Sequence, residues 1–399
     1  MKISQYWKII SLTILLSLSI IFCFTNLKSQ KLERWDEYTN FSVVYDTIES
    51  DDELILTQNG EPFFEKPPLW YYLSIASTEL FGLNLFALRF VSALSGVLLI
   101  MLIWYMGYKM FSFTSGIVAG FSLLATSHLF IPNPAGVFSS HTLRSADLDA
   151  LQLLFIMISA FSFYMILSQP KKWLFWTSIS SIYTSLAFLT KGPFALLPPL
   201  LFFSYIAIQQ VLDKKDKALN NCQWKNIVII FITFLGQSLL ITAPWHIAMY
   251  IRFKDEFVSS YFGYHMLIRG FTTIEEHYGR FYYYIRILLD PRFGFLGIAT
   301  IISSIIIIKN FGMKILHSYP LYMTLGGLSI CFLIISIIQT KLAWYVFYLY
   351  PLGALLVGNT IHHILKYSSS IKSRILIFSP LILYLLFHIA IILLYLCKL

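Results

Sequence analysis

The chain has 399 residues, of which 57% are hydrophobic and 12% charged, and its formal net charge is +9. Soluble domains are about 25% charged, so this composition and a mean hydropathy of +0.71 exclude an ordinary soluble protein. Many apolar runs reach the roughly 20 residues that cross a bilayer as a helix, and their continuity excludes a transmembrane β-barrel. We therefore predict an all-α, polytopic membrane protein that forms a single integral-membrane domain over residues 1–399.

The predicted elements are about eleven membrane-spanning helices. The first is Trp7–Asn26. Lys2 and Lys8 precede its apolar stretch and no small-x-small cleavage site follows, so we interpret it as an uncleaved span. The remaining spans are predicted at Asn84–Tyr108, Ser112–Ile131, Ala146–Leu167, Trp173–Thr190, Pro193–Leu212, Asn226–Tyr250, Phe293–Ile308, Tyr319–Ile338, Ala343–Leu365 and Ile375–Cys397. Two large loops, 27–83 and 250–292, separate these spans, and no soluble C-terminal domain is expected.

The cations of the short loops gather on one side of the predicted membrane. The positive-inside rule assigns that side to the cytoplasm, together with the N-terminus. The same pattern accounts for the net charge without a nucleic-acid partner. We expect a plasma (inner) membrane protein whose two large loops lie on the extracytoplasmic side. The cytoplasmic cations are Lys2, Lys8, Lys109, Lys171, Lys172, Lys214, Lys215, Lys217, Lys225, Lys309, Lys314, Lys366, Lys372 and Arg374.

The first large loop holds acidic, basic and aromatic residues close to the membrane. Its segments are Glu33-Arg34-Trp35-Asp36-Glu37-Tyr38 and, further on, Glu65-Lys66 followed by two prolines. The stretch Lys66–Phe81 has apolar residues at helical spacing and predicts an interfacial helix, as does Phe281–Leu289 in the second loop. Ionisable groups beside hydrocarbon are costly and usually functional, so we place the chemistry here.

Two pairs of carboxylates are candidates for acid–base work. Asp36 and Glu37 follow the first span by about ten residues, and aromatic residues flank them. Most such dipeptides are solvated loop charges, but nearby carboxylates push their pKa values apart, which suits one of them to proton abstraction. Asp147 and Asp149 begin a later span. We expect one to turn inward and the other to cap the helix, and two capping acids are an equally good interpretation.

Cations and a histidine complete the pattern. Lys191, between two spans, is either a snorkelling lysine or a point-charge ligand for phosphate, and Lys341 repeats that position later in the chain. His265 has Arg269 one turn away and shares its side of the membrane with Glu65. One histidine, one glutamate and water suit a divalent ion, with zinc, magnesium and manganese left open. The four cysteines are scattered and predict no disulfide framework.

These motifs, taken in order along the chain, resemble those of the GT-C membrane glycosyltransferases. The chain is similar to the group of lipid A aminoarabinose transferases and dolichyl-phosphate-mannose–protein mannosyltransferases. The shared segments are Asp36-Glu37, Phe63–Leu69, Arg144–Asp149, Leu189–Pro193, Pro244-Trp245, His265, and Lys341 with Trp344-Tyr345. Family members of the aminoarabinose type have more spans and a further soluble domain, and Ser145-Ala146 replaces their commoner Thr-Gly.

The resemblance implies a role for each candidate residue. It makes Asp36 the general base, with Glu37 beside it and Asp149 as a second acid. It makes Arg34, Lys66, Lys191, Arg269, Lys341 and Tyr345 ligands of the donor phosphate. It assigns Glu65 and His265 to a divalent metal ion, and it implies no organic cofactor.

The predicted function is inverting transfer of a sugar from a polyprenyl-phosphate donor. The acceptor is extracytoplasmic and is a lipid A-like glycolipid, a protein or a polymer; the sugar, a hexose or a pentose, is not specified by the sequence. The alternative is a lipid or solute transporter or flippase. A transporter usually has polar groups near the bilayer midplane and repeat symmetry, and neither is visible in this sequence.

Overall fold

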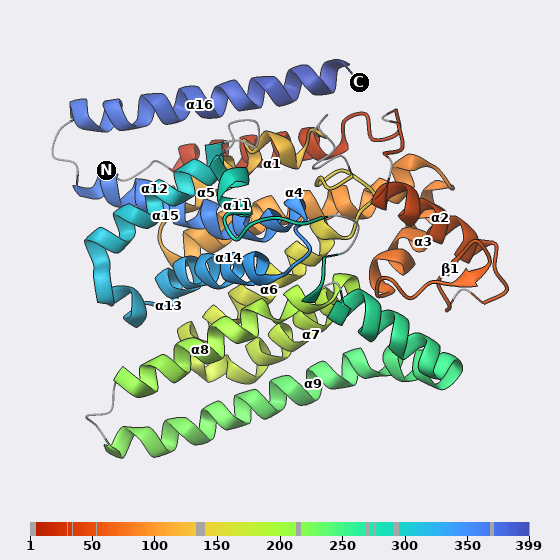
Figure 1. Cartoon of the computed structure of the whole chain (residues 1–399). Helices are drawn as coiled ribbons and strands as arrows, with labels where there is room; N and C mark the ends of the chain where they lie inside the picture. Colours follow the sequence, from red (N-terminus) through yellow and green to blue (C-terminus); the bar gives the residue numbers. More distant parts are fainter. Residues whose placement is uncertain are drawn as a thin grey trace.

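The computed structural model describes residues 5–29, 31–33, 35–52, 54–132, 140–212, 217–268, 271–273, 277–289, 295–367 and 371–398. Most of these residues lie in helices whose axes run side by side along the molecule (Figure 1). The long helices of the first half are α1 (Gln5–Phe24), α4 (Leu85–Met110), α5 (Phe113–Leu124), α6 (Asp149–Ser168), α7 (Trp173–Lys191), α8 (Leu197–Leu212) and α9 (Lys217–Phe257).

The second half is broken into shorter helical pieces. The α-helices are α11 (Tyr283–Leu289), α12 (Phe295–Phe311), α13 (Tyr319–Leu321), α14 (Gly327–Ile337), α15 (Tyr350–Tyr367) and α16 (Ile371–Lys398). Short 3-10 helices are η1 (Ser127–Leu129), η2 (Pro170–Lys172), η3 (Pro193–Leu196), η6 (Gly312–His317) and η8 (Ala343–Leu349), and π-helical turns are η4 (Val258–Ile268) and η7 (Tyr322–Gly326).

Each of the eleven predicted spans coincides with a helix or with a run of adjoining helical pieces. Within the described residues, seven helices are long and apolar enough to cross a membrane. The helix predicted at Ser112–Ile131 ends earlier, at Leu124, and η1 follows it. The all-α, polytopic fold is therefore confirmed, whereas the count of eleven crossings stays a prediction.

The first large loop is more ordered than its sequence indicates. It holds α2 (Asp36–Ile48), which the sequence did not predict, and α3 (Leu69–Phe81), which begins directly after Pro68 as expected. A short antiparallel pair, β1 (Thr57–Gln58) and β2 (Glu61–Pro62), joins them. All of these elements gather at one end of the helical bundle (Figure 1).

Packing at this end fixes the loop onto the bundle. Val43 and Val44 of α2 lie in one buried cluster with Trp70 and Tyr71 of α3. The Tyr71 hydroxyl donates to Asn40 Oδ1 at 2.8 Å, and Asn40 Nδ2 donates to the Ala146 carbonyl at 2.9 Å. Because buried polar groups need partners, this chain of hydrogen bonds ties α2 to the segment that leads into α6.

Small residues bring the helix backbones into contact within the bundle. A Cβ atom on Gly116 of α5 would lie 2.4 Å from the Trp104 carbonyl oxygen of α4. A Cβ atom on Gly358 of α15 would lie 2.2 Å from the Ser115 carbonyl oxygen of α5. Membrane helices associate through such small-residue contacts because lipid provides no hydrophobic driving force between them. This packing gives the site described next a rigid support.

Candidate active site

Glu37 and Arg89 form a buried ion pair at the base of the first loop. Arg89 Nε donates to Glu37 Oε1 and Arg89 Nη2 donates to Glu37 Oε2, both at 2.8 Å, and each side chain is 1% exposed. The glutamate also accepts from the Ala146 and Glu33 backbone amides at 2.8 Å. Every carboxylate oxygen is thus engaged, and the pair anchors α2 to α4 and to the 140–148 segment.

Asp36, the next residue, faces a different set of partners. Its Oδ1 accepts from Lys66 Nζ at 2.5 Å, and its Oδ2 lies 3.0 Å from His141 Nε2. The Asp36 side chain is 25% exposed, whereas those of Lys66 and His141 are 8% and 2% exposed. Asp36 is therefore the most exposed of these three side chains.

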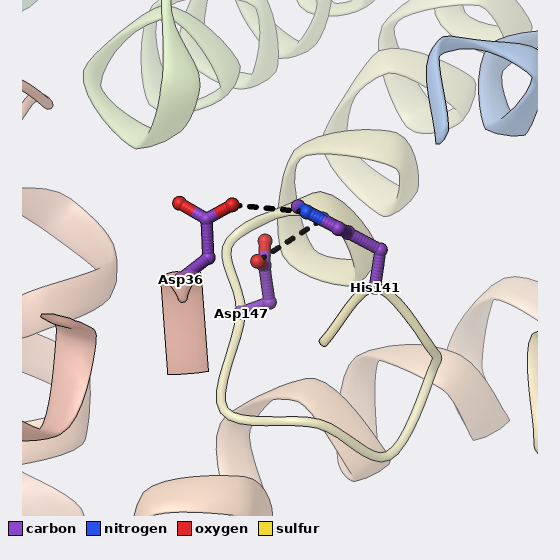
Figure 2. Close-up of side chains that lie close together, drawn as sticks. All are labelled: Asp36, His141 and Asp147. Atoms are coloured by element: carbon purple, nitrogen blue, oxygen red, sulfur yellow. Dashed lines mark ion pairs between the residues drawn. The ribbon is translucent and has the colours of Figure 1, made fainter. Parts of the chain in front are cut away.

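His141 joins Asp36 to the second carboxylate pair. Its Nδ1 lies 2.8 Å from Asp149 Oδ2 and 3.2 Å from Asp147 Oδ2. Figure 2 shows the ring between Asp36 and Asp147, with an ion pair to each. On the far side of the pair, Lys191 Nζ donates to Asp149 Oδ1 at 2.6 Å and to Asp147 Oδ1 at 3.3 Å.

Asp147 and Asp149 divide the two expected roles, helix cap and inward-facing acid, only in part. Asp147 Oδ1 does accept from the Asp149 backbone amide at 3.1 Å, as a capping residue would. Yet both carboxylates also contact His141 and Lys191, so both turn inward. Because Asp147 lies in the segment before α6 and only Asp149 is in the helix, the argument from a shared helical face did not apply to them.

Burial and charge together set the pKa values in this cluster. Burial alone raises the pKa of Asp36, but Lys66 and His141 more than offset it and hold that pKa well below its usual range. Burial raises the pKa of Asp147, and Lys191 and His141 offset this only in part. Burial lowers the pKa of His141, but Asp147, Asp149 and Asp36 outweigh it and raise the pKa to about 9. The ring is therefore an imidazolium at neutral pH.

A cavity of about 480 Å³ adjoins the cluster. Lys66 and Lys191 lie on its wall together with Glu65 and His265. Apolar residues of η3, α8 and the C-terminal end of α14 form much of the remaining lining: Pro193, Phe194, Leu196, Leu197, Leu200, Ile334 and Ile338. Pro67, Gly192 and three tyrosines, Tyr261, Tyr345 and Tyr348, complete it. The cavity thus combines two ammonium groups with an apolar wall, which suits an amphiphile with an anionic head.

The turn after α7 places Lys191 at this cavity. Gly192 adopts φ 88° and ψ −139°, a left-handed conformation that glycine adopts without strain. Gln152 Nε2 donates to the Ala187 and Gly192 carbonyls at 3.2 Å, and the Tyr348 hydroxyl donates to Gln152 Oε1 at 2.5 Å. Gln152 therefore holds the turn from the same helix that carries Asp149.

Of the remaining candidate residues, some line the cavity and others do not. Tyr345 lines the cavity, as do Glu65 and His265. Lys341 does not line it: Nζ donates to the carbonyls of Ile335, Ser336 and Ile338 and so closes the end of α14. Arg34 and Arg269 lie outside the described residues. The structure therefore brings together Asp36, Lys66, Asp149 and Lys191, and it places Glu37 behind them.

His141 was not among the candidate residues from the sequence, and its stacking partner Trp344 was named there only as part of the Lys341 segment. The two rings lie 3.9 Å apart at 14°. A histidine three residues before Arg144, in a segment already singled out for its acids, was the available signal. The stacking carried no signal, because the partners are far apart in sequence.

Two groups of metal-type donors lie in this region, and the first fits a divalent ion. The carboxylate of Glu65 and the imidazole of His265 share one cavity wall and offer the hard and intermediate donors that such ions accept. A second group, Asp36, His141 and Asp147, has donor atoms within 4.8 Å of one another. The site is therefore compatible with a metal ion, and the chemistry of neither set selects one element.

A sequence profile of the family described as dolichyl-phosphate-mannose-protein mannosyltransferase matches residues 65–238. An undecaprenyl phosphate-alpha-4-amino-4-deoxy-L-arabinose arabinosyl transferase of Aeromonas salmonicida is 24% identical over 287 residues, which cover 70% of this chain and 48% of that protein. The chain spans about half to two thirds of the length of the curated relatives that it matches.

Solved structures show the same fold. ArnT from Cupriavidus metallidurans, in its crystal structure bound to undecaprenyl phosphate, superposes with a TM-score of 0.71 at 19% identity, covering 90% of this chain and 61% of that one. An Archaeoglobus fulgidus oligosaccharyltransferase in complex with Zn and sulfate superposes with a TM-score of 0.62 at 14% identity, covering 96% and 52%.

The fold is that of a multi-pass membrane protein, and the proteins that share it are membrane glycosyltransferases. The chain is thus similar to GT-C membrane glycosyltransferases of the group that contains the aminoarabinose transferases and the dolichyl-phosphate-mannose–protein mannosyltransferases.

Proposed function

We propose that this protein transfers a sugar from a polyprenyl phosphate to an extracytoplasmic acceptor with inversion at the anomeric carbon. The observation that carries the proposal is the junction of the Asp36 cluster with the cavity that Lys66 and Lys191 line. A carboxylate for proton removal thus lies beside cations for a phosphate, and an apolar wall suits a lipid chain.

In this mechanism the acceptor hydroxyl attacks the anomeric carbon while Asp36 takes its proton. A new carbon–oxygen bond forms, and the bond between the anomeric carbon and the phosphate oxygen breaks. The polyprenyl phosphate leaves as an anion, so fixed cations matter more than a general acid. Lys66 and Lys191 supply that charge, and both lie on the cavity wall.

Lys66 connects the two halves of this mechanism. It pairs with Asp36 in the structure, and this pairing helps to keep the pKa of Asp36 low. A donor phosphate in the cavity competes for the same ammonium group. Movement of Lys66 toward the phosphate would free Asp36 Oδ1 and raise its basicity, which links donor binding to activation of the base.

The proposal assigns further residues to supporting roles. Glu65 and His265 would hold a divalent ion, which would supply positive charge beside the donor phosphate. Tyr345, also on the cavity wall, would contact the donor. Glu37 anchors α2 through Arg89. Arg34, Arg269 and Lys341 remain candidates for the phosphate from the family resemblance.

A direct assay tests the proposed function. Purified protein in vesicles is incubated with undecaprenyl phosphates that carry a radiolabelled hexose or pentose, together with envelope extract as acceptor. We expect release of undecaprenyl phosphate and transfer of label to one fraction, lipid or protein. Mass spectrometry of envelope lipids and glycoproteins from a deletion strain identifies that acceptor. Movement of lipid across the vesicle without any covalent transfer would instead support a flippase.

The proposed orientation places the N-terminus in the cytoplasm and Asp36 on the extracytoplasmic face of the inner membrane. In a cysteine-free background, we expect Gln58→Cys to react with an impermeant thiol reagent from outside. Lys215→Cys should react only from inside. Reversed labelling would put the cluster on the cytoplasmic face and contradict the proposed topology.

A further inference from the structure

His141 is the most connected side chain of the cluster, and it comes from a loop rather than a helix. Its two ring nitrogens face carboxylates on opposite sides: Asp36 at 3.0 Å from Nε2, and Asp149 at 2.8 Å from Nδ1 (Figure 2 shows the first of these). Trp344 of η8 stacks on one ring face. The ring is 2% exposed, so neither nitrogen has water as an alternative partner.

Charge balance explains why a buried ring can be charged here. Among the described residues, the groups that face the ring or its carboxylate partners come from α2, the segment before α3, the loop before α6, α6 and α7. Three are anionic and two are cationic: Asp36, Asp147, Asp149, Lys66 and Lys191. An imidazolium makes the set electrically neutral, whereas a neutral ring leaves one uncompensated buried charge, which is costly.

We propose that His141 is a positioning residue for the glycosyl transfer: its charged ring bridges Asp36 to the Asp147–Asp149 pair and fixes the orientation of the Asp36 carboxylate. This inference rests on the function proposed above. With Lys66 on Oδ1 and His141 on Oδ2, Asp36 is held from both sides. When Lys66 turns to the donor phosphate, His141 remains as the contact that keeps the carboxylate in place.

Asp36, His141 and Asp147 also form a candidate metal group, but His141 cannot be a charged bridge and a metal ligand at the same time. An imidazolium has no lone pair for a metal. Lys66 and Lys191 already occupy one oxygen of Asp36 and one of Asp147. The lysines therefore supply the positive charge that a metal would otherwise bring, which favours the protonated bridge.

Two substitutions of His141 test the contacts of Nε2 and of Nδ1 separately. The amide nitrogen of glutamine reaches roughly the place of Nε2, and that of asparagine roughly the place of Nδ1. His141→Gln thus keeps a donor for Asp36, and His141→Asn keeps one only for Asp147 and Asp149. We expect the Asn variant to lose about ten- to a hundredfold in kcat, the size of one charge-assisted contact, at an unchanged KM for the donor. The Gln variant should lose clearly less.

The pH profile gives a readout that a merely structural role would not move. For wild-type protein we expect kcat to fall as the pH rises through about 9, where the ring loses its proton. Neither amide titrates, so both variants should lack this decline. The Tm, measured over the same pH range, tests the His141 bridge without any activity assay.

Several outcomes would overturn the bridge. Equal kcat values for both variants and wild type would show that the contact with Asp36 is unimportant. A larger loss for Gln than for Asn would place the functional contact on the other nitrogen. A divalent ion bound by wild type, retained by Glu65→Ala and lost in His141→Gln, would assign the ring to a metal. Absence of transfer by the wild type contradicts the proposed function instead, and the unfolding profile still tests the bridge.

Discussion

Asp36 and Glu37 are neighbours in the chain, yet they lie in two different electrostatic environments. Glu37 accepts two hydrogen bonds from Arg89 and two from backbone amides, and it is 1% exposed. Asp36 has Lys66 and His141 as partners and is 25% exposed. The Glu37 carboxylate is thus fully occupied by fixed, buried groups. The Asp36 carboxylate is instead paired with a lysine that also lines the cavity. A single helix start thus provides one anchor and one reactive group.

The largest expected effect is the loss of turnover when Asp36, the reactive carboxylate, is substituted. Asp36→Asn preserves size and hydrogen-bonding capacity but removes basicity. Loss of a general base costs roughly 10²–10⁴-fold in rate. We expect turnover to collapse while undecaprenyl phosphate still binds. The Tm should also fall, because Lys66 and His141 lose their shared counter-charge, so turnover is measured at a temperature where the variant is folded. Near-normal turnover by the purified variant would move the search for the base to Glu65 or Asp149.

The corresponding substitution of Glu37, the anchoring carboxylate, should lower the stability of the folded protein. Glu37→Gln leaves Arg89 with an uncompensated buried charge, and breaking such a pair costs about 3–5 kcal/mol. We expect a large drop in Tm, measured by thermal unfolding in detergent. The matched control is Glu49→Gln, at the exposed end of the same helix, which should change little. A stable but inactive Glu37→Gln protein would mean that both carboxylates take part in catalysis.

Donor binding tests whether the two lysines on the cavity wall hold the donor phosphate. Lys66→Ala and Lys191→Ala each remove a charge-assisted contact worth about 1.5–3 kcal/mol, which is roughly ten- to a hundredfold in affinity. Binding of undecaprenyl phosphate, followed by titration calorimetry, should weaken by that factor in each variant. Lys109→Ala, an exposed lysine at the end of α4, is the control. Unchanged affinity in both cavity variants would mean that the phosphate binds elsewhere.

The smallest expected effect is the pH dependence of stability. The His141 pKa rises from an ordinary value of 6.5 to about 9 in the folded protein. Its contribution is thus fully present below about pH 6.5 and is lost as the pH rises through about 9. The Tm should decline over this window in wild type, and the decline should be smaller in His141→Gln. A Tm that is flat across the window in wild type would show that the folded ring is not protonated.

The helical part of the fold could be predicted from the sequence because membrane helices must satisfy their backbone internally and be apolar over their length. Helix α2 escaped prediction because its apolar residues, such as Val43 and Val44, are few and lie among polar ones. Its helical state depends on packing against α3, which no local pattern records.

The site was predictable only where the chemistry is local in sequence. Asp36, Lys66, Asp149 and Lys191 were candidates by residue type and position, and the fold brings them together. The bridge by His141 depends on its contact with Asp36, about a hundred positions away, and no local sequence pattern predicts that contact. Lys341 shows the converse, because its sequence setting matches that of Lys191 while its ammonium group closes the end of α14.

The turn at Gly192 constrains how this chain can vary. A residue with a side chain is strained at φ 88°, and a shift of the turn would move Lys191 away from Asp149. A saturation library along α7 should therefore show a sharp boundary. Outward-facing positions such as Leu174 and Phe175, which are 52% and 56% exposed, should accept most apolar replacements. Position 192 should accept almost none, although its residue has no side chain to take part in the chemistry.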